Sequence, residues 1–129
     1  VADSDATRAI FASFSAEPMF EFVMQSYPES DRAIYDDPAF IALYKAALAD
    51  AFAPGAVGYA ADTVLAMRPW NLALDQISIP VRVLYGEDDA FHSPDLGLTL
   101  VPRIANATRT IVEGIGGSLL WSPRLPALV

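Results

Sequence analysis

In the second half of the chain the sequence reads Val81-Arg82-Val83-Leu84-Tyr85-Gly86-Glu87-Asp88-Asp89. Residues 81–85 are mainly β-branched and apolar and lie between Pro80 and Gly86, which predicts a short strand of a parallel sheet, buried on both faces. An acidic turn follows this strand. Because open parallel sheets carry their chemistry at the carboxyl ends of the strands, Asp89 is a candidate functional carboxylate.

The residues after this turn predict the rest of a parallel unit. A helix is expected from Ser93-Pro94 to about residue 103, because serine caps helices and proline fits the first turn. A second strand is expected over residues 108–113, followed by the glycine-rich segment 114–117, and a last helix is expected to start at Ser122-Pro123. The order strand, helix, strand, helix predicts a βαβα unit with two parallel strands joined by a right-handed crossover.

The first half of the chain has a helical pattern instead. Helices are expected over residues 7–15, 18–25 and 56–67, and a longer one begins at Asp36-Asp37-Pro38 and ends at Pro54-Gly55. Aromatic side chains recur at helical spacing in these segments. They are suited to line an apolar cleft, but ordinary core packing is the favoured interpretation.

Composition limits the possible functions. The chain has 129 residues, enough for one domain or part of one. It contains no cysteine and one histidine, and its net charge is −8. This charge repels nucleic acid and anionic membrane surfaces, so neither is an expected partner. Thiolate and histidine-rich metal sites are excluded, and without a phosphate-binding glycine loop no cofactor is expected. The sequence contains neither a membrane-spanning apolar run nor a signal-peptide pattern, so a soluble, cytoplasmic protein is expected.

Three segments together resemble the carboxyl-terminal half of the α/β-hydrolase family. The segment 68–72 (Arg-Pro-Trp-Asn-Leu) is similar to the end of the family's cap, and 77–89 is similar to its penultimate core strand with the acid turn. The third segment, residues 102–107 together with 111–116, is similar to its crossover and last strand. The resemblance implies a partial α/β-hydrolase fold, with a helical cap-like segment over residues 1–69 and the C-terminal part of the core over residues 70–129.

The resemblance also assigns the candidate site. Asp89 matches the family's acid, counted from Gly86, and would hold an imidazole in the correct tautomer; the alternative is an acidic turn residue that only organises backbone N–H groups. Gly117 stands where the catalytic histidine would follow Gly116, and glycine cannot accept a proton. His92 is three residues beyond the acid, and an exposed loop histidine is favoured over a replacement base.

The nucleophile of the family lies on a Gly-x-Ser-x-Gly elbow, which this chain lacks, because Ser118 is followed by leucines. The resemblance therefore implies a C-terminal portion of a hydrolase-like protein that is catalytically incomplete by itself. The parent would cleave ester, amide or similar bonds in a small apolar substrate. A non-catalytic binding or regulatory protein on the same scaffold is the alternative.

A self-contained α/β interaction domain is a third possibility. Two strands leave open sheet edges, so a homodimer or a contact with a missing N-terminal portion is expected.

Overall fold

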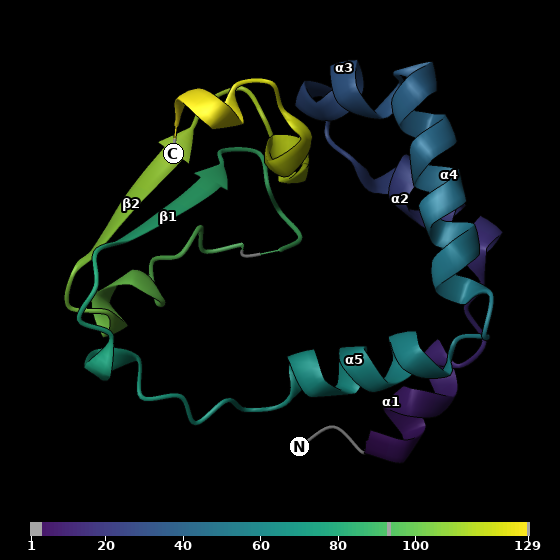
Figure 1. The fold of residues 1–129 in the computed structure, drawn as a ribbon, viewed down its shortest axis with the longest axis horizontal. Helices are drawn as coiled ribbons and strands as arrows, with labels where there is room; N and C mark the ends of the chain where they lie inside the picture. Colours follow the sequence, from purple (N-terminus) through teal and green to yellow (C-terminus); the bar gives the residue numbers. More distant parts are fainter. Residues whose placement is uncertain (1–3, 93, 129) are drawn as a thin grey trace. The chain divides into compact units, whose positions relative to one another are not determined.

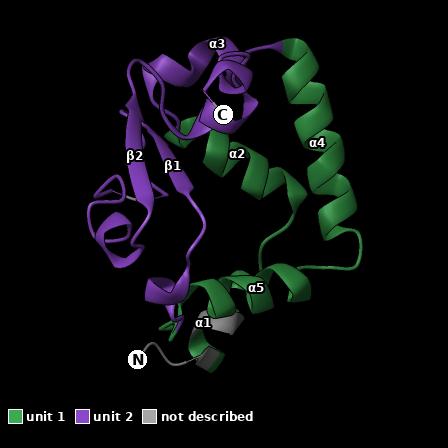
Figure 2. Cartoon of the chain, turned by 60° about the vertical axis from the view of Figure 1, so that its left-hand side comes forward, with its two compact units in different colours: residues 1–26, 38–71 green, residues 27–37, 72–129 purple. Residues whose placement is uncertain are grey.

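The computed structural model describes residues 4–92 and 94–128, and they form a small α/β protein with a two-stranded parallel sheet (Figure 1). The chain divides into two compact units, coloured separately in Figure 2. The first unit comprises residues 1–26 and 38–71, and the second comprises residues 27–37 and 72–129. The segment 27–37 therefore belongs with the strands, although it lies between helices of the first unit in the sequence.

The first unit is built from four helices that pack in two pairs. They are α1 (Ser4–Phe11), α2 (Ala16–Ser26), α4 (Pro38–Phe52) and α5 (Val57–Met67), with α1 against α5 and α2 against α4. The four helices expected from the sequence are thus confirmed, with bounds shifted by a few residues at α1 and α2.

Aromatic rings hold both helix pairs together. The centroid of the Tyr59 ring on α5 lies 5.7 Å from the centroid of the Phe11 ring and 5.8 Å from that of the Phe14 ring. In the other pair Phe20 faces Tyr44 at 6.2 Å, and the Lys45 ammonium lies 4.3 Å above the Phe20 ring. Ring pairs at these separations add to the free energy of apolar burial. These aromatic rings therefore contact one another between paired helices while staying half-buried or exposed, and the buried residues among the described side chains of the four helices are Met19, Leu48 and Ala60.

The helices of the described residues can be compared with the length and composition that a membrane span needs. Among the described residues no single helix has the length and apolar composition to cross a bilayer. Helices α4 and α5 pass that test only when taken together, and their axes differ by 95° at the break between them.

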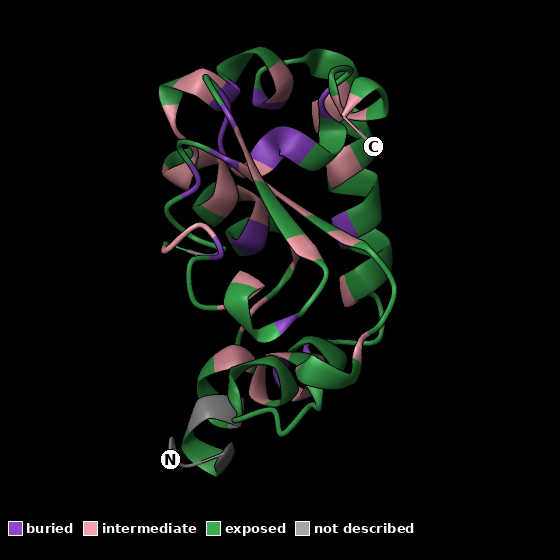
Figure 3. Cartoon of the chain, turned by 90° about the vertical axis from the view of Figure 1, so that its left-hand side faces the viewer, coloured by how far each residue is buried: buried purple, intermediate pink, exposed green. Residues whose placement is uncertain are grey.

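The second unit contains the sheet. Strands β1 (Val81–Gly86) and β2 (Ala107–Val112) pair in parallel, in register from Val81 opposite Ala107 to Gly86 opposite Val112. Both predicted strands are confirmed. Their side chains are mostly half-buried or exposed, with burial complete only at the last residue of each strand (Figure 3). The expected burial on both faces is therefore wrong for this two-stranded sheet.

Short helices surround the strands in this unit. They are η1 (Glu29–Asp31), α3 (Arg32–Tyr35), η2 (Leu74–Gln76), η3 (Val101–Arg103), η4 (Gly117–Trp121) and η5 (Leu125–Ala127), all of them 3-10 helices except α3. The buried core consists of Val112, Ile115 and Leu119, against which Ile34 and Leu84 pack. This core lies at the carboxyl ends of the strands and in the segment that follows β2.

The helix expected between the strands is not formed. Ser93 lies outside the described residues, and residues 94–100 form turns followed only by η3. The Asp95 carboxylate accepts the backbone N–H groups of Gly97 (3.0 Å) and Thr99 (2.9 Å), which competes with helical hydrogen bonding. Leu96 and Gly97 have φ of 47° and 79°, outside the helical region. The predicted βαβα unit is corrected accordingly, and the expected last helix is reduced to η5.

Candidate functional site

The acid turn after β1 and the glycine loop after β2 lie side by side. The backbone N–H of Glu87 donates to the Val112 carbonyl at 2.9 Å, and that of Asp88 donates to the Ile115 carbonyl at 3.0 Å. These bonds continue the parallel ladder beyond the strand ends. Parallel pairing therefore brings residues 86–89 and 113–117 to one edge of the sheet.

Gly86 permits the closest approach between these two segments. A Cβ atom on Gly86 would lie 2.2 Å from the Gly116 carbonyl oxygen and 2.5 Å from that of Ile115. Both obstacles are backbone atoms, which cannot rotate away as a side chain can. Glycine is required here because the two backbones are in contact.

Asp89 is held in one orientation by its own turn. Its side chain is 8% exposed, and its Oδ1 accepts the backbone N–H groups of Phe91 at 3.1 Å and His92 at 3.0 Å. Burial alone would raise the pKa of the carboxyl. The two backbone hydrogen bonds and the neighbouring imidazole outweigh it, so the pKa of Asp89 lies below its ordinary value. Asp89 therefore carries a negative charge at neutral pH, and it does organise backbone N–H groups, as the alternative interpretation proposed.

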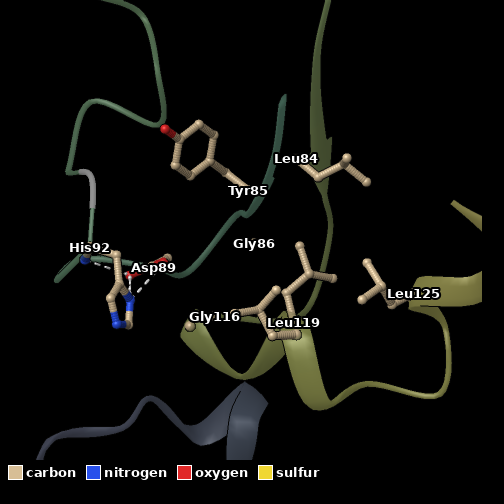
Figure 4. A pocket seen from close by; sticks show the side chains of 10 residues that line it. Leu84, Tyr85, Gly86, Asp89, His92, Gly116, Leu119 and Leu125 are labelled. Atoms are coloured by element: carbon tan, nitrogen blue, oxygen red, sulfur yellow. Dashed lines mark hydrogen bonds and ion pairs between the residues drawn. The ribbon is translucent and has the colours of Figure 1, made fainter. Parts of the chain in front are cut away.

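His92 pairs with this carboxylate. Its Nδ1 lies 3.1 Å from both Oδ1 and Oδ2 of Asp89, shown as dashed lines in Figure 4. The His92 side chain is 72% exposed, as expected for a loop histidine. The structure adds the hydrogen bond to the acid, which sequence reasoning did not favour.

Gly117 lies beside both members of this pair. A Cβ atom on Gly117 would be 3.7 Å from Oδ2 of Asp89, 3.0 Å from Nδ1 of His92 and 2.8 Å from its Cε1. The structure thus brings together the three positions singled out in the sequence. The place next to the acid is occupied by the ring of His92.

A buried carboxylate that the sequence did not reveal holds the glycine loop from the other side. Asp31 is 1% exposed, and it accepts the backbone N–H groups of Gly116 at 2.6 Å and Ser118 at 3.0 Å. It also accepts the Ser118 hydroxyl at 2.8 Å. Three hydrogen bonds offset the cost of burying this carboxylate. Ser118 is itself fully buried, so its hydroxyl serves the loop and is not available as a nucleophile.

A pocket of about 460 Å³ opens next to the acid turn (Figure 4). Its lining is mainly apolar and includes Leu84, Tyr85, Leu119, Leu120 and Leu125. Asp89, His92, Gly116 and Gly117 also line it. An apolar pocket with a few polar groups at one side is the usual form of a small-molecule site.

The described part of the chain contains no candidate metal centre. Within residues 4–92 and 94–128 no group of three or more histidine, cysteine, aspartate or glutamate side chains is arranged to hold a metal ion. Comparisons with protein-family models, with curated proteins and with solved structures find no match for this chain.

Proposed function

We propose that this chain is the cap and C-terminal core portion of an α/β-hydrolase-like protein. It contributes the acid and the substrate pocket of a site that cleaves ester, amide or similar bonds in small apolar molecules. The nucleophile belongs to a part of the protein outside this chain. The observation that carries the proposal is the ionised, nearly buried Asp89, which follows a parallel strand and borders an apolar pocket.

The shape of the pocket supports a small apolar substrate. Its leucine and tyrosine side chains can bury an alkyl or aryl group, while the carboxylate and the imidazole lie at one side. A carboxylate in this place stabilises an imidazolium that forms when a nucleophile loses its proton. The pocket and the acid are therefore arranged for a substrate whose reactive bond lies next to an apolar group.

The ester phenyl butyrate tests catalysis and binding by this chain in two separate measurements. We expect no turnover of phenyl butyrate above buffer, because the chain carries no Gly-x-Ser-x-Gly elbow. Saturable hydrolysis by the purified chain would overturn the proposal. Binding should nevertheless occur, and it is measured as saturable shifts of leucine methyl signals in NMR spectra during titration.

A pair of leucine variants tests whether this binding uses the pocket. Leu120 lines the pocket and is 70% exposed, so Leu120→Asp should fold normally. We expect it to weaken binding about tenfold, equivalent to roughly 1.4 kcal/mol of lost apolar contact. Leu98→Asp is the matched control, because Leu98 is 61% exposed and is not part of the pocket lining. Equal affinities for the two variants would exclude this pocket as the binding site.

A non-catalytic binding protein is the second candidate, favoured by Gly117, which stands where the family's catalytic histidine would follow Gly116. In that case the pocket binds a small apolar ligand without cleaving it. The complete coding sequence of the protein separates the two candidates. A Gly-x-Ser-x-Gly elbow in it supports the hydrolase, and its absence together with pocket binding supports the binding protein.

A further inference from the structure

The ring of His92 lies in the space that a side chain at position 117 would need. A Cβ on Gly117 would come within 2.8 Å of Cε1 and 3.0 Å of Nδ1 of His92, closer than a Cβ atom normally approaches another atom. The glycine and the histidine are therefore sterically linked. The imidazole reaches Asp89 in this orientation because position 117 has no side chain.

The hydrogen bonds of Asp89 set the orientation of this ring. One carboxylate oxygen accepts two backbone N–H groups from the turn that carries His92, which fixes the backbone of the histidine relative to the acid. Both oxygens then accept from Nδ1 at 3.1 Å. Among the described residues no partner engages Nε2, so this nitrogen is free on a ring that lines the pocket. The depressed pKa of Asp89 agrees with a carboxylate that accepts these bonds.

We propose that His92 is the acid–base residue of this site and takes the role that Gly117 cannot fill. The inference rests on the proposed hydrolase function. A neutral His92 that donates Nδ1–H to Asp89 keeps a lone pair on Nε2, and this ring is exposed at the side of the pocket. When a serine hydroxyl of the complete site attacks the substrate carbonyl carbon, its proton passes to Nε2, and Asp89 stabilises the resulting imidazolium. The same proton is then transferred to the alcohol oxygen or amine nitrogen that leaves.

This arrangement places the acid and the base on one short turn. In a triad assembled from separate loops, the fold as a whole must align the two groups. Here the spacing of three residues and the backbone hydrogen bonds to Asp89 produce the alignment locally. The tautomer of His92 should therefore depend on Asp89 and on the absence of a side chain at position 117.

The tautomer can be measured directly, because His92 is the one histidine of the chain. In ¹⁵N-histidine NMR spectra at a pH where the imidazole is neutral, we expect the Nδ1–H form to predominate. Asp89→Asn should shift the ring to the Nε2–H form, since the asparagine amide donates where the carboxylate accepted. A wild-type ring that is mainly in the Nε2–H form would overturn the proposal.

Gly117→Ala tests the steric link. The φ of Gly117 is outside the left-handed region and the obstacle is a flexible side chain, so this variant should fold. We expect the added methyl group to displace the ring and to reduce the Nδ1–H fraction. Gly58→Ala is the matched control, because a Cβ there meets nothing within 4 Å. An unchanged tautomer in Gly117→Ala would refute the shared use of this space.

Titration with phenyl butyrate separates this inference from the proposed function. If His92 faces the bound substrate, the Nε2 and Hε1 signals should shift in parallel with the methyl signals of Leu119 and Leu125. Shifts of the leucines without any shift of the histidine would refute the role of His92 and leave the pocket proposal intact. Hydrolysis of the ester by the chain alone would instead refute the proposed function.

Discussion

Replacing Asp31 tests the contact on which the geometry of the glycine loop depends. Its carboxylate accepts three hydrogen bonds from Gly116 and Ser118 while being 1% exposed. Asp31→Ala would leave two buried backbone N–H groups without an acceptor, because only the serine hydroxyl can rotate toward another partner. Each orphaned group costs about 1–3 kcal/mol, so we expect a loss of about 4 kcal/mol in the free energy of unfolding.

Two further variants should lower the free energy of unfolding by smaller amounts. In Asp31→Asn the amide oxygen keeps the bonds made by Oδ1, but the amide nitrogen faces the backbone N–H of Ser118, so about 2 kcal/mol should be lost. Ser118→Ala removes only the hydroxyl bond and should cost about 1 kcal/mol. Asp75→Ala is the control, since Asp75 is an exposed aspartate on η2 and a surface change of this kind falls within about 0.5 kcal/mol.

Urea unfolding followed by tryptophan fluorescence measures these differences in the second unit alone. In a Trp70→Phe background the remaining tryptophan is Trp121, on η4, which directly follows the loop held by Asp31. With a slope of about 2 kcal/mol per M, a loss of 4 kcal/mol lowers the midpoint by about 2 M. An Asp31→Ala midpoint no lower than that of Ser118→Ala would refute the structural role of the carboxylate.

Two other predictions concern the acid turn. Gly86→Ala should lower the free energy of unfolding by about 3 kcal/mol in the same fluorescence assay, because its Cβ would collide with the backbone carbonyls of Gly116 and Ile115. A loss below about 1 kcal/mol would contradict this contact. The second prediction follows from the lowered pKa of Asp89, because a depressed pKa in the folded state stabilises the fold above the unfolded pKa. The stability advantage of the wild type over Asp89→Asn should therefore shrink as the pH falls below about 4, and an advantage that persists or grows below that pH would contradict it.

The sequence predicts those parts of the fold that depend on local signals. The strand at residues 81–86 follows from a mainly apolar run with two valines that begins after Pro80, and helix α4 follows from Pro38 and an apolar stripe at helical spacing. The position of Asp89 at the end of the strand follows from the same pattern. These features need no information about distant residues.

Other features depend on side chains that compete with the local pattern. Residues 93–103 have a capping residue and an apolar stripe, yet the Asp95 carboxylate captures two backbone N–H groups that a helix would use. Gly97 is also packed against the Tyr85 ring, where a Cβ would lie 2.4 Å from Cε2. Helix propensity alone does not reveal this contact between the connecting segment and strand β1.

The site itself was only partly predictable for the same reason. Gly116 and Ser118 donate hydrogen bonds to Asp31, from which they are separated by 85 and 87 positions in the sequence. No pattern in the sequence indicates a contact over such a separation. The pairing of His92 with Asp89 depends on the conformation of their turn, which the two backbone hydrogen bonds to the carboxylate determine. The order Asp-x-x-His alone is compatible with many loop conformations.

A nuclear Overhauser measurement between His92 and Gly117 tests the arrangement of the site. In the structure the turn after β1 and the loop after β2 meet at one edge of the sheet, with the imidazole against the glycine. We therefore expect a strong cross-peak between Hε1 of His92 and the Hα protons of Gly117. A folded chain without this cross-peak would contradict the geometry from which the function is argued.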